Sequence, residues 1–247
     1  MNPLTELWAW LTDPANWAGS AGIPVRIFEH LEISAAAVVA ATLVAMPVGL
    51  FIGHARKAEF VTVTAANLGR AIPSFAVLAL AFPIALEVGL GFSNWPIIAA
   101  LFLLAIPPIL TNTYVGVKGV DRDTVEAARG MGVAERGVLR SIELPLAAPL
   151  IVAGIRTSAV QVVATATLGA IIAGGGLGRY IIDGFSQQDD GMLLGGALLV
   201  ALLAIVTELG FGVLERVVRP QTRSGDREDV TSEEEPGPTG RPDSPAL

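Results

Sequence analysis

The stretch that organises this chain runs from Glu126-Ala127-Ala128 through Gly132 to Ile142-x-Leu144-Pro145. Three residues separate the alanine pair from the glycine, and nine separate the glycine from the isoleucine. Long apolar segments lie on either side of this stretch. The pattern therefore predicts a short polar loop between two membrane spans, exposed where another protein can act on it.

The composition of the 247-residue chain is that of a membrane protein, because 52% of its residues are hydrophobic and only 16% are charged. Soluble domains carry about 25% charged residues. Several stretches contain almost no charge and are long enough to cross a hydrocarbon core of roughly 30 Å as helices. We therefore predict an all-α, polytopic membrane protein.

We expect about five transmembrane helices. Their approximate bounds are 31–53, a segment within 60–86, 95–117, 147–173 and 192–214. The second segment is the least regular, because Asn67 and Arg70 precede Pro73. It is either one kinked helix or a shallow amphipathic piece followed by a span, and the latter arrangement would raise the number of membrane segments to six.

Basic residues in the loops predict the orientation of these spans, because short cytoplasmic loops are enriched in Lys and Arg. The loops after the first and third spans and the C-terminal flank are basic, whereas the other two loops are poor in basic residues. The basic residues are Arg56, Lys57, Lys118, Arg122, Arg129, Arg136, Arg140, Arg216, Arg219 and Arg223. Five spans then place the N-terminus outside and the C-terminus inside.

Two terminal regions flank the predicted transmembrane domain at residues 31–217. Residues 1–30 contain Trp8, Trp10 and Trp17, which suits either an interfacial segment at the outer membrane surface or a poorly ordered terminus. This region lacks the features of a signal peptide. Residues 218–247 are rich in Ser, Glu, Pro and Gly and hold much of the net charge of −7, so we expect a disordered cytoplasmic tail and no nucleic-acid binding.

The chain has no cysteine, and its two histidines, His30 and His54, are far apart in sequence. We therefore expect no disulfide and no metal site. A membrane-embedded hydrolase is disfavoured, because neither histidine has a plausible nucleophile and acid beside it. An ion-coupled secondary transporter would show buried acids and inverted repeats, whereas Glu87 and Glu208 lie near span ends and no repeat is evident.

The loop between the third and fourth spans has signals for two short helices. Asp123 can cap the first helix, with Glu126 three residues later completing a capping box. Gly130 and Gly132 supply flexible or left-handed positions suited to ending that helix. A second helix is expected to follow and to stop before Pro145. Local pattern alone leaves open whether this is an ordinary connector or an element that passes motion into the membrane.

The full pattern resembles the signature of permease subunits of binding-protein-dependent ABC importers, position by position. In that family the loop, here about residues 118–146, is a coupling helix that docks in a cleft of the ATP-hydrolysing subunit. The resemblance implies a MetI-like permease fold. It assigns a docking turn to Glu126, Ala127, Ala128 and Gly132, and the start of the helix that returns to the membrane to Ile142, Leu144 and Pro145.

The resemblance extends from about residue 30 to residue 215. Over this range the sequence is similar to the glycine betaine, carnitine and choline subgroup, whose members import quaternary-ammonium osmoprotectants. The segments that carry it are 70–74, 107–114, 126–132, 143–147, 153–157, 164–168 and 174–178. The Gly-Gly-Leu-Gly segment also occurs in permeases for methionine and other small solutes. An amino-acid importer is therefore the alternative.

What the resemblance implies is transport without catalysis in this chain. ATP would be bound by a partner, so no cofactor is expected here. The partners would be ABC ATPase subunits, a second permease that is identical or related, and a separate extracytoplasmic solute-binding protein, since the chain has no room for a fused one. The complex would lie in the bilayer of a bacterial cell membrane as a multi-pass protein.

Residues that interrupt the apolar character of the spans are candidates for the translocation path, because ionisable groups inside a membrane usually face a bundle interior or a watery path. The candidates are Arg70, Pro73, Gln161, Thr165 and Thr167. Interhelical hydrogen bonding is an equally good account of Gln161 and the two threonines. Arg156, near the cytoplasmic end of its span, can simply snorkel to the interface.

The glycine-rich segment Gly174-Gly175-Gly176-Leu177-Gly178 is expected to form a tight turn at the outer mouth. It follows a membrane span and lacks the Lys-Ser/Thr ending of a phosphate loop. Aromatic residues make up only 6% of the chain, which leaves little material for a cage around a quaternary ammonium group. We therefore expect solute recognition to belong mainly to the external binding protein.

Overall fold

The computed structural model describes residues 2–56, 64, 73–90, 93–172 and 174–218. Within these ranges every regular element is helical. In chain order the elements are α1 (Pro3–Thr12), η1 (Pro14–Trp17), α2 (Ile23–Ala55), α4 (Ser74–Glu87), α5 (Trp95–Lys118), α6 (Arg122–Gly130), α7 (Glu135–Val138), η2 (Leu139–Glu143), α8 (Leu144–Thr165), η3 (Ala166–Ile172), α9 (Gly178–Gln187) and α10 (Asp190–Val218).

In the part of the chain that the structure describes, four helical stretches are long and apolar enough to cross a membrane: α2, α5, residues 135–172 and α10. They match the first, third, fourth and fifth expected spans. The apolar helix α4 has only 14 residues, and most of the rest of the second expected segment lies outside the described residues. The all-α membrane fold is confirmed, whereas the form of the second span stays a prediction.

The first span begins at Ile23, eight residues before the expected start at Leu31. The sequence prediction stopped at the polar residues Arg26, Glu29 and His30, but these side chains are paired in the structure. Arg26 donates a hydrogen bond of 2.8 Å to Glu29, and the His30 ring lies 2.8 Å from the carbonyl oxygen of Val163. The helix continues through these residues, and the Nε atom of Arg26 is a buried donor without a hydrogen-bond partner.

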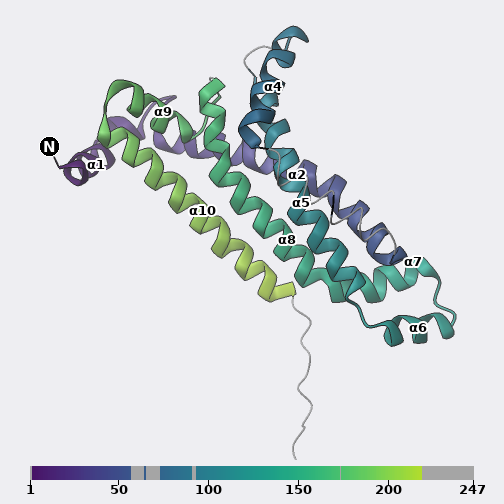
Figure 1. The fold of residues 1–247 in the computed structure, drawn as a ribbon. Helices are drawn as coiled ribbons and strands as arrows, with labels where there is room; N and C mark the ends of the chain where they lie inside the picture. Colours follow the sequence, from purple (N-terminus) through teal and green to yellow (C-terminus); the bar gives the residue numbers. More distant parts are fainter. Residues whose placement is uncertain (1, 57–63, 65–72, 91–92, 173, 219–247) are drawn as a thin grey trace, which may run out of the picture.

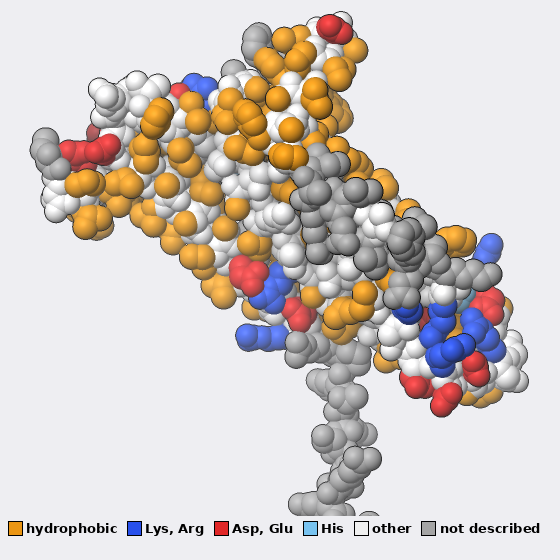
Figure 2. Space-filling view, in the orientation of Figure 1, with side chains coloured by type: hydrophobic (Ala, Val, Ile, Leu, Met, Phe, Trp, Pro, Cys, Tyr) orange, Lys and Arg blue, Asp and Glu red, His pale blue; other side chains and the backbone are white. Residues whose placement is uncertain are grey.

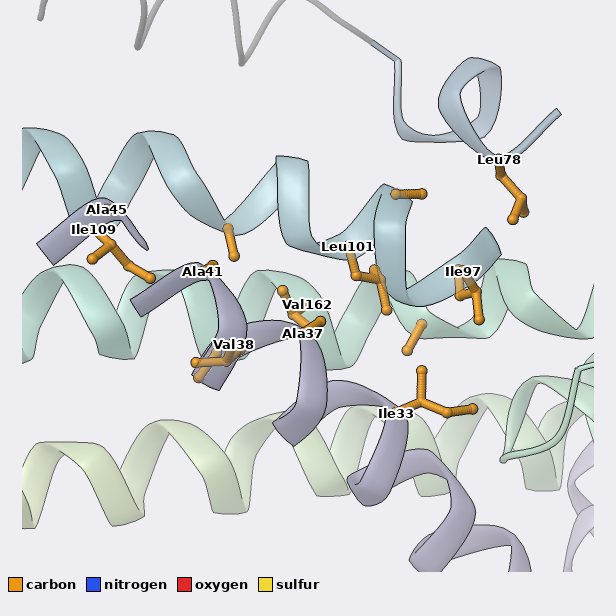
Figure 3. Close-up of a cluster of buried hydrophobic side chains, with 14 of the residues drawn as sticks. Ile33, Ala37, Val38, Ala41, Ala45, Leu78, Ile97, Leu101, Ile109 and Val162 are labelled. Carbon is orange, nitrogen blue, oxygen red and sulfur yellow. The ribbon is translucent and has the colours of Figure 1, made fainter. Parts of the chain in front are cut away.

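Helix α5 is the centre of the bundle and packs against α2 on one side and α8 on the other (Figure 1). Small and β-branched side chains fill the space between the three helices, as the close-up in Figure 3 shows. The buried residues include Ile33, Ala37, Ala41, Leu101, Ile109 and Val162. Alanines dominate the α2 side of this cluster, so the two helix backbones lie close together.

Two glycines of α2 mark the closest approach to α5. A Cβ atom added to Gly49 would lie 2.8 Å from Cβ of Thr113, and one added to Gly53 would lie 2.8 Å from Cβ of Val117. Small residues spaced by four positions let membrane helices approach and gain van der Waals contact, which replaces the hydrophobic driving force that lipid does not supply. The contact fixes the C-terminal end of α2 against the end of α5.

The two ends of the bundle carry different elements. Helices α6 and α7 project from one end, whereas α1 and α9 lie at the other (Figure 1). In the space-filling view of Figure 2, Lys and Arg side chains gather over α6 and α7 and near the C-terminal end of α10. The basic loops predicted to be cytoplasmic therefore share one end of the molecule, apart from residues 57 and 219 onward, which lie outside the described residues.

We predict that Gly53→Ala destabilises the protein by about 1–3 kcal/mol, the usual cost of overpacking a close contact. The added methyl group would overlap Val117 and push α2 away from α5. The matched control is Gly210→Ala, since a Cβ atom there meets nothing within 4 Å. Thermal unfolding of the purified protein in detergent measures the difference, and equal melting temperatures for the two variants would contradict the packing argument.

Candidate functional site

Helix α6 begins at an aspartate cap, but not at the expected one. The carboxylate of Asp121 accepts hydrogen bonds from the backbone N–H of Thr124 (2.8 Å) and from its hydroxyl (3.0 Å). Asp123 lies inside the first turn instead, and Glu126 is exposed rather than part of a capping box. The prediction was wrong by two residues because two aspartates compete, and only Asp121 reaches both donors of Thr124.

The end of α6 is fixed by a left-handed glycine, as the sequence predicted for this region. Gly132 has φ of +83°. Its N–H donates to the carbonyl of Arg129 (2.9 Å), and the N–H of Val133 donates to the carbonyl of Ala128 (3.1 Å). This pair of bonds is the Schellman arrangement that closes helix C-termini. The chain therefore turns sharply after Gly130, and the turn is exposed.

The loop has a small apolar core of its own. Its members are Val120, Val125, Ala128 and Val138, with Ile142 packed against them. The signature residues are thus divided between two roles: Ala128 and Ile142 face inward, whereas Glu126, Ala127 and Gly132 are exposed. The inward residues hold the shape of the projection, and the exposed residues form a low surface at its tip.

The second loop helix was predicted to stop before Pro145. In the structure it instead runs into the membrane span. Residues Leu139–Glu143 form a π-helical turn in which the N–H of Leu144 donates to the carbonyl of Leu139. In an ordinary α-helix the Pro145 ring would meet the carbonyl four residues earlier. The wider turn gives the ring room, so α7, η2 and α8 form one continuous helical stretch.

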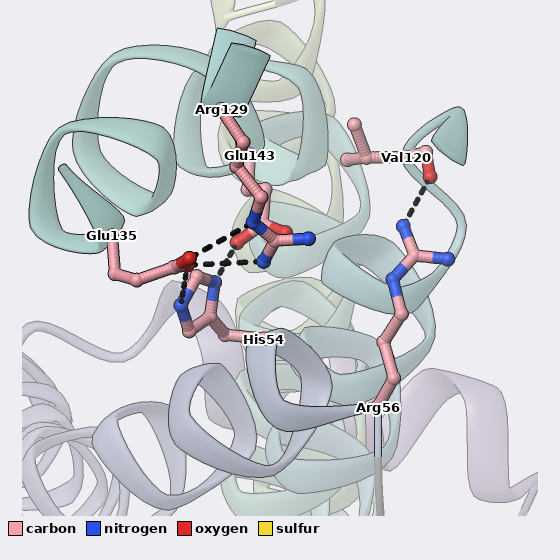
Figure 4. A network of polar contacts seen from close by, with 6 residues as sticks. All are labelled: His54, Arg56, Val120, Arg129, Glu135 and Glu143. Carbon is pink, nitrogen blue, oxygen red and sulfur yellow. Dashed lines mark hydrogen bonds and ion pairs between the residues drawn. The ribbon is translucent and has the colours of Figure 1, made fainter. Parts of the chain in front are cut away.

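A polar network joins the loop to the end of α2 (Figure 4). His54 lies between two carboxylates, with Nδ1 at 2.5 Å from Oε2 of Glu143 and Nε2 at 3.1 Å from Oε2 of Glu135. Arg129 donates to both oxygens of Glu135, from Nε at 2.9 Å and from Nη2 at 3.0 Å. Glu143 is fully buried. The network thus connects α2, α6, α7 and η2.

Sequence reasoning missed this network. The expectation was that neither histidine has both a nucleophile and an acid beside it, and the structure supplies His54 with an acid, Glu143, which is 89 residues away in sequence but within hydrogen-bond distance. Glu143 occupies the variable position between Ile142 and Leu144, and nothing in the local sequence indicates that it is buried or that it contacts His54. The residues around His54 pair with one another, and the described part of the chain holds no group of His, Asp and Glu suited to a metal ion.

The expected glycine turn is present and is fixed to α2. Gly176 has φ of +87°, and its N–H donates to Glu29 at 2.8 Å. The N–H of Leu177 lies 3.3 Å from Nδ1 of His30. A Cβ atom on Gly178 would lie 2.4 Å from the carbonyl oxygen of Thr167, so the turn packs tightly on η3. Its place at an outer mouth, together with Gly174 and Gly175, stays a prediction.

The structure does not gather the translocation-path candidates into one site. Gln161 is exposed on α8, Thr165 ends that helix, and the Thr167 hydroxyl donates to the carbonyl of Ala164 (3.1 Å). Pro73 is exposed just before α4, and Arg70 lies outside the described residues. An apolar cavity of about 410 Å³ between α2, α8 and α10 is lined by other residues, among them Ser34, Val38, Ala159, Val163 and Phe211.

Arg156 on α8 is ion-paired to the neighbouring helix. Its guanidinium group contacts Glu208 and lies 2.9 Å from Glu215, both on α10. The structure thus adds an ion-paired cluster that links α8 to α10, and snorkelling of Arg156 to the interface stays a prediction. The cluster lies at a partly exposed helix interface, where the side chains of Arg156 and Glu208 are 31% and 42% exposed.

Comparison with known proteins identifies the family. The family described as "Binding-protein-dependent transport system inner membrane component" matches residues 45–222. That match covers most of the chain and includes the whole loop. The chain belongs to this family and is a membrane-embedded transport permease.

Relatives support the same assignment. The choline transport system permease protein OpuBB of Bacillus subtilis is 40% identical over 195 residues, which cover 79% of this chain and 88% of that protein. The glycine betaine/carnitine/choline transport system permease protein OpuCB of the same organism is 40% identical over 200 residues, 81% of this chain and 90% of the relative. The osmoprotectant import permease protein OsmW of Salmonella typhimurium is 35% identical over 194 residues, which cover 78% of this chain and 90% of that protein.

Solved structures show the same fold. An inward-facing conformation of the MetNI methionine ABC transporter aligns with a TM-score of 0.70 at 21% identity, covering 85% of this chain and 100% of that chain. An amino acid ABC transporter crystallised with histidines aligns with a TM-score of 0.60 at 18% identity, covering 79% and 91%. The MetI-like permease fold expected from the sequence is confirmed.

We predict that Gly132→Ala weakens the loop by about 1–2 kcal/mol, because a side chain in the left-handed conformation costs roughly that much. Hydrogen exchange of the α6 amides should accelerate accordingly. Gly130→Ala is the matched control, since Gly130 is helical and a Cβ atom there meets nothing within 4 Å. Equal exchange in both variants would show that the turn does not depend on the left-handed position.

We predict that acidification frays the start of α6. Hydrogen bonds from the N–H and hydroxyl of Thr124 hold the pKa of Asp121 below its ordinary value. A depressed folded-state pKa means that the cap stabilises the helix above the ordinary aspartate pKa and is lost as pH falls through the folded value. Protection factors of α6 amides should follow this course, whereas Asp121→Asn, a neutral cap, should show no such loss.

Proposed function

We propose that the chain forms the transmembrane path of an ABC importer for a small quaternary-ammonium osmoprotectant in a bacterial cell membrane. A separate ATPase would dock on α6 and the turn at Gly132, and ATP would be bound there, not in this chain. A separate solute-binding protein would deliver the solute at the opposite end. A second permease, identical or related, would complete the path.

The observation that carries the docking proposal is the form of the loop tip. Glu126, Ala127 and Gly132 are exposed on a projection whose own core and caps hold it in one shape. Met131 beside them is 78% exposed. Small exposed residues next to an apolar side chain leave room for another protein's backbone to approach. A rigid projection transmits a displacement to the helices from which it extends.

The orientation proposal is supported by the distribution of charge. The basic side chains around α6, α7 and the end of α10 lie at one end of the bundle, which would face the cytoplasm under the positive-inside rule. The N-terminal helix α1 and the glycine turn lie at the other end. An ATPase in the cytoplasm could then reach α6, and a binding protein outside could reach the glycine turn.

The solute proposal is supported by the relatives, whose names refer to choline, glycine betaine and carnitine. The cavity between α2, α8 and α10 has an almost entirely apolar lining in which Phe211 is the aromatic residue, so it offers no aromatic cage. Selection of the solute would rest mainly with the binding protein. Gln161 and Thr165, one turn apart on α8, would face the path completed by the second permease.

We predict that Ala127→Trp abolishes association with the ATPase and uptake of radiolabelled choline in proteoliposomes that hold permease, ATPase and binding protein. A bulky side chain at the exposed tip would keep the partner from approaching, and a loss of at least tenfold in affinity corresponds to about 1.4 kcal/mol. Co-purification with the ATPase and uptake kinetics measure the two effects.

The control is Leu43→Trp, which adds the same group to an exposed position in the middle of α2 and should leave both measurements unchanged. Uptake that continues without any ATPase would contradict the importer proposal. Uptake of methionine in place of choline and glycine betaine would contradict the solute class while leaving the docking proposal intact.

A further inference from the structure

The first membrane span has no covalent connection to the coupling loop. The loop between α5 and α8 is continuous with those two helices, so any displacement of α6 pulls on them through the backbone. Helix α2 ends at Ala55 and packs against both α5 and α8 without being continuous with the loop. If α2 is to move with the loop, side-chain contacts must carry the motion.

Two side chains at the end of α2 reach the loop in Figure 4. Arg56 donates a hydrogen bond of 2.8 Å to the carbonyl of Val120, which follows α5 by only two residues. That contact holds the start of the loop, where Val120 packs with Val125 and Ala128 of α6. His54 reaches further, to Glu135 at the start of α7 and to Glu143 in the π-helical turn. His54 therefore contacts the part of the loop that follows the docking turn.

The contact between His54 and Glu143 is built to resist separation. The Glu143 side chain is fully buried, and its Oε2 lies 2.5 Å from Nδ1 of the ring. Separating a buried carboxylate from its partner leaves an uncompensated charge in a medium that solvates it poorly. Both ring nitrogens face carboxylate oxygens, so the ring contacts Glu135 and Glu143 at once. The pair therefore stays together when the loop is pushed.

The network continues from His54 to the docking helix itself. Arg129 lies in the last turn of α6, directly after Ala128 of the signature. It donates hydrogen bonds to both carboxylate oxygens of Glu135. Fork-shaped arginine–carboxylate pairs restrict direction as well as distance. Two successive contacts, Arg129 to Glu135 and Glu135 to His54, thus join α6 to α2.

We infer that His54 is a positioning residue that ties the coupling loop to the first membrane span, so that a displacement of α6 moves α2 together with α5 and α8. The inference rests on the proposed function, in which an ATPase pushes on α6. Without the tie, α6 would still bind the ATPase, but α7 and η2 would no longer be held to the end of α2, and a displacement of α6 would reach α2 only through the packing of the spans and the contact of Arg56. ATP would then be hydrolysed with less solute imported.

The test variant must break the tie without leaving a buried charge. His54→Ala alone would leave the buried Glu143 without its partner, and the protein could fail to fold for that reason. The double variant His54→Ala/Glu143→Leu removes both members, and replacing a buried charged pair by apolar groups is often neutral for stability. Ser141→Ala is the matched control, since Ser141 is an exposed neighbour of Glu143 in the same π-helical turn.

The first measurement uses the permease alone. Because the chain has no cysteine, spin labels can be placed at Phe51→Cys on α2 and Met131→Cys beside the docking turn, which are 74% and 78% exposed. In lipid nanodiscs the background and Ser141→Ala proteins should give the same narrow distance distribution. The double variant should give a broad distribution. An unchanged distribution would contradict the inference that His54 holds the loop to α2.

The second measurement uses the reconstituted importer with radiolabelled choline as the probe. The double variant should retain ATPase association and hydrolysis but import fewer choline molecules per ATP, by about fivefold or more, the lower end of usual coupling strengths between sites. An unchanged ratio, or loss of ATPase association, would overturn the positioning role. If the background protein binds no ATPase, the proposed function fails instead, and the distance measurement still decides whether the tie exists.

Discussion

The close approach of α2 and α5 is the contact on which the rest of the structure depends. Lipid gives membrane helices no hydrophobic reason to associate, so packing and hydrogen bonds must hold them together. Gly49 and Gly53 remove the side chains that would keep the two backbones apart. Because His54 follows Gly53, the same contact brings the imidazole ring to the end of α5, where the loop begins. Packing inside the bundle thus places the polar network at its edge.

The loop shows how a short segment is held in one shape. Helix α6 has nine residues, and a helix of that length is marginal in isolation. Its stability comes from the Asp121 cap, the turn at Gly132, the apolar cluster around Ala128 and the ion pairs to Glu135. The signature that identifies the family therefore encodes a shape, because Ala128 and Ile142 are buried while Glu126 and Ala127 remain exposed.

Local rules succeeded where one signal acts alone and failed where two compete. The apolar runs gave four of the spans, since lipid enforces length and composition. Gly132 was predicted as a turn position because few other residues adopt positive φ at low cost. The cap was misplaced because Asp121 and Asp123 are equivalent in pattern and differ only in which one meets Thr124. The helix stop before Pro145 was wrong because a π-helical turn accommodates the ring.

The sequence by itself determined the class of the protein, the existence of its spans and the position of the loop that carries the signature, because these depend on composition, charge distribution and a motif of fixed spacing. Only the tertiary structure decided that His54 lies between Glu135 and Glu143, that Arg156 pairs with Glu208 and Glu215, and that the glycine turn is held by Glu29 and His30. Each of these contacts joins residues from different helices. The helix packing that brings them together leaves no periodic pattern in the chain.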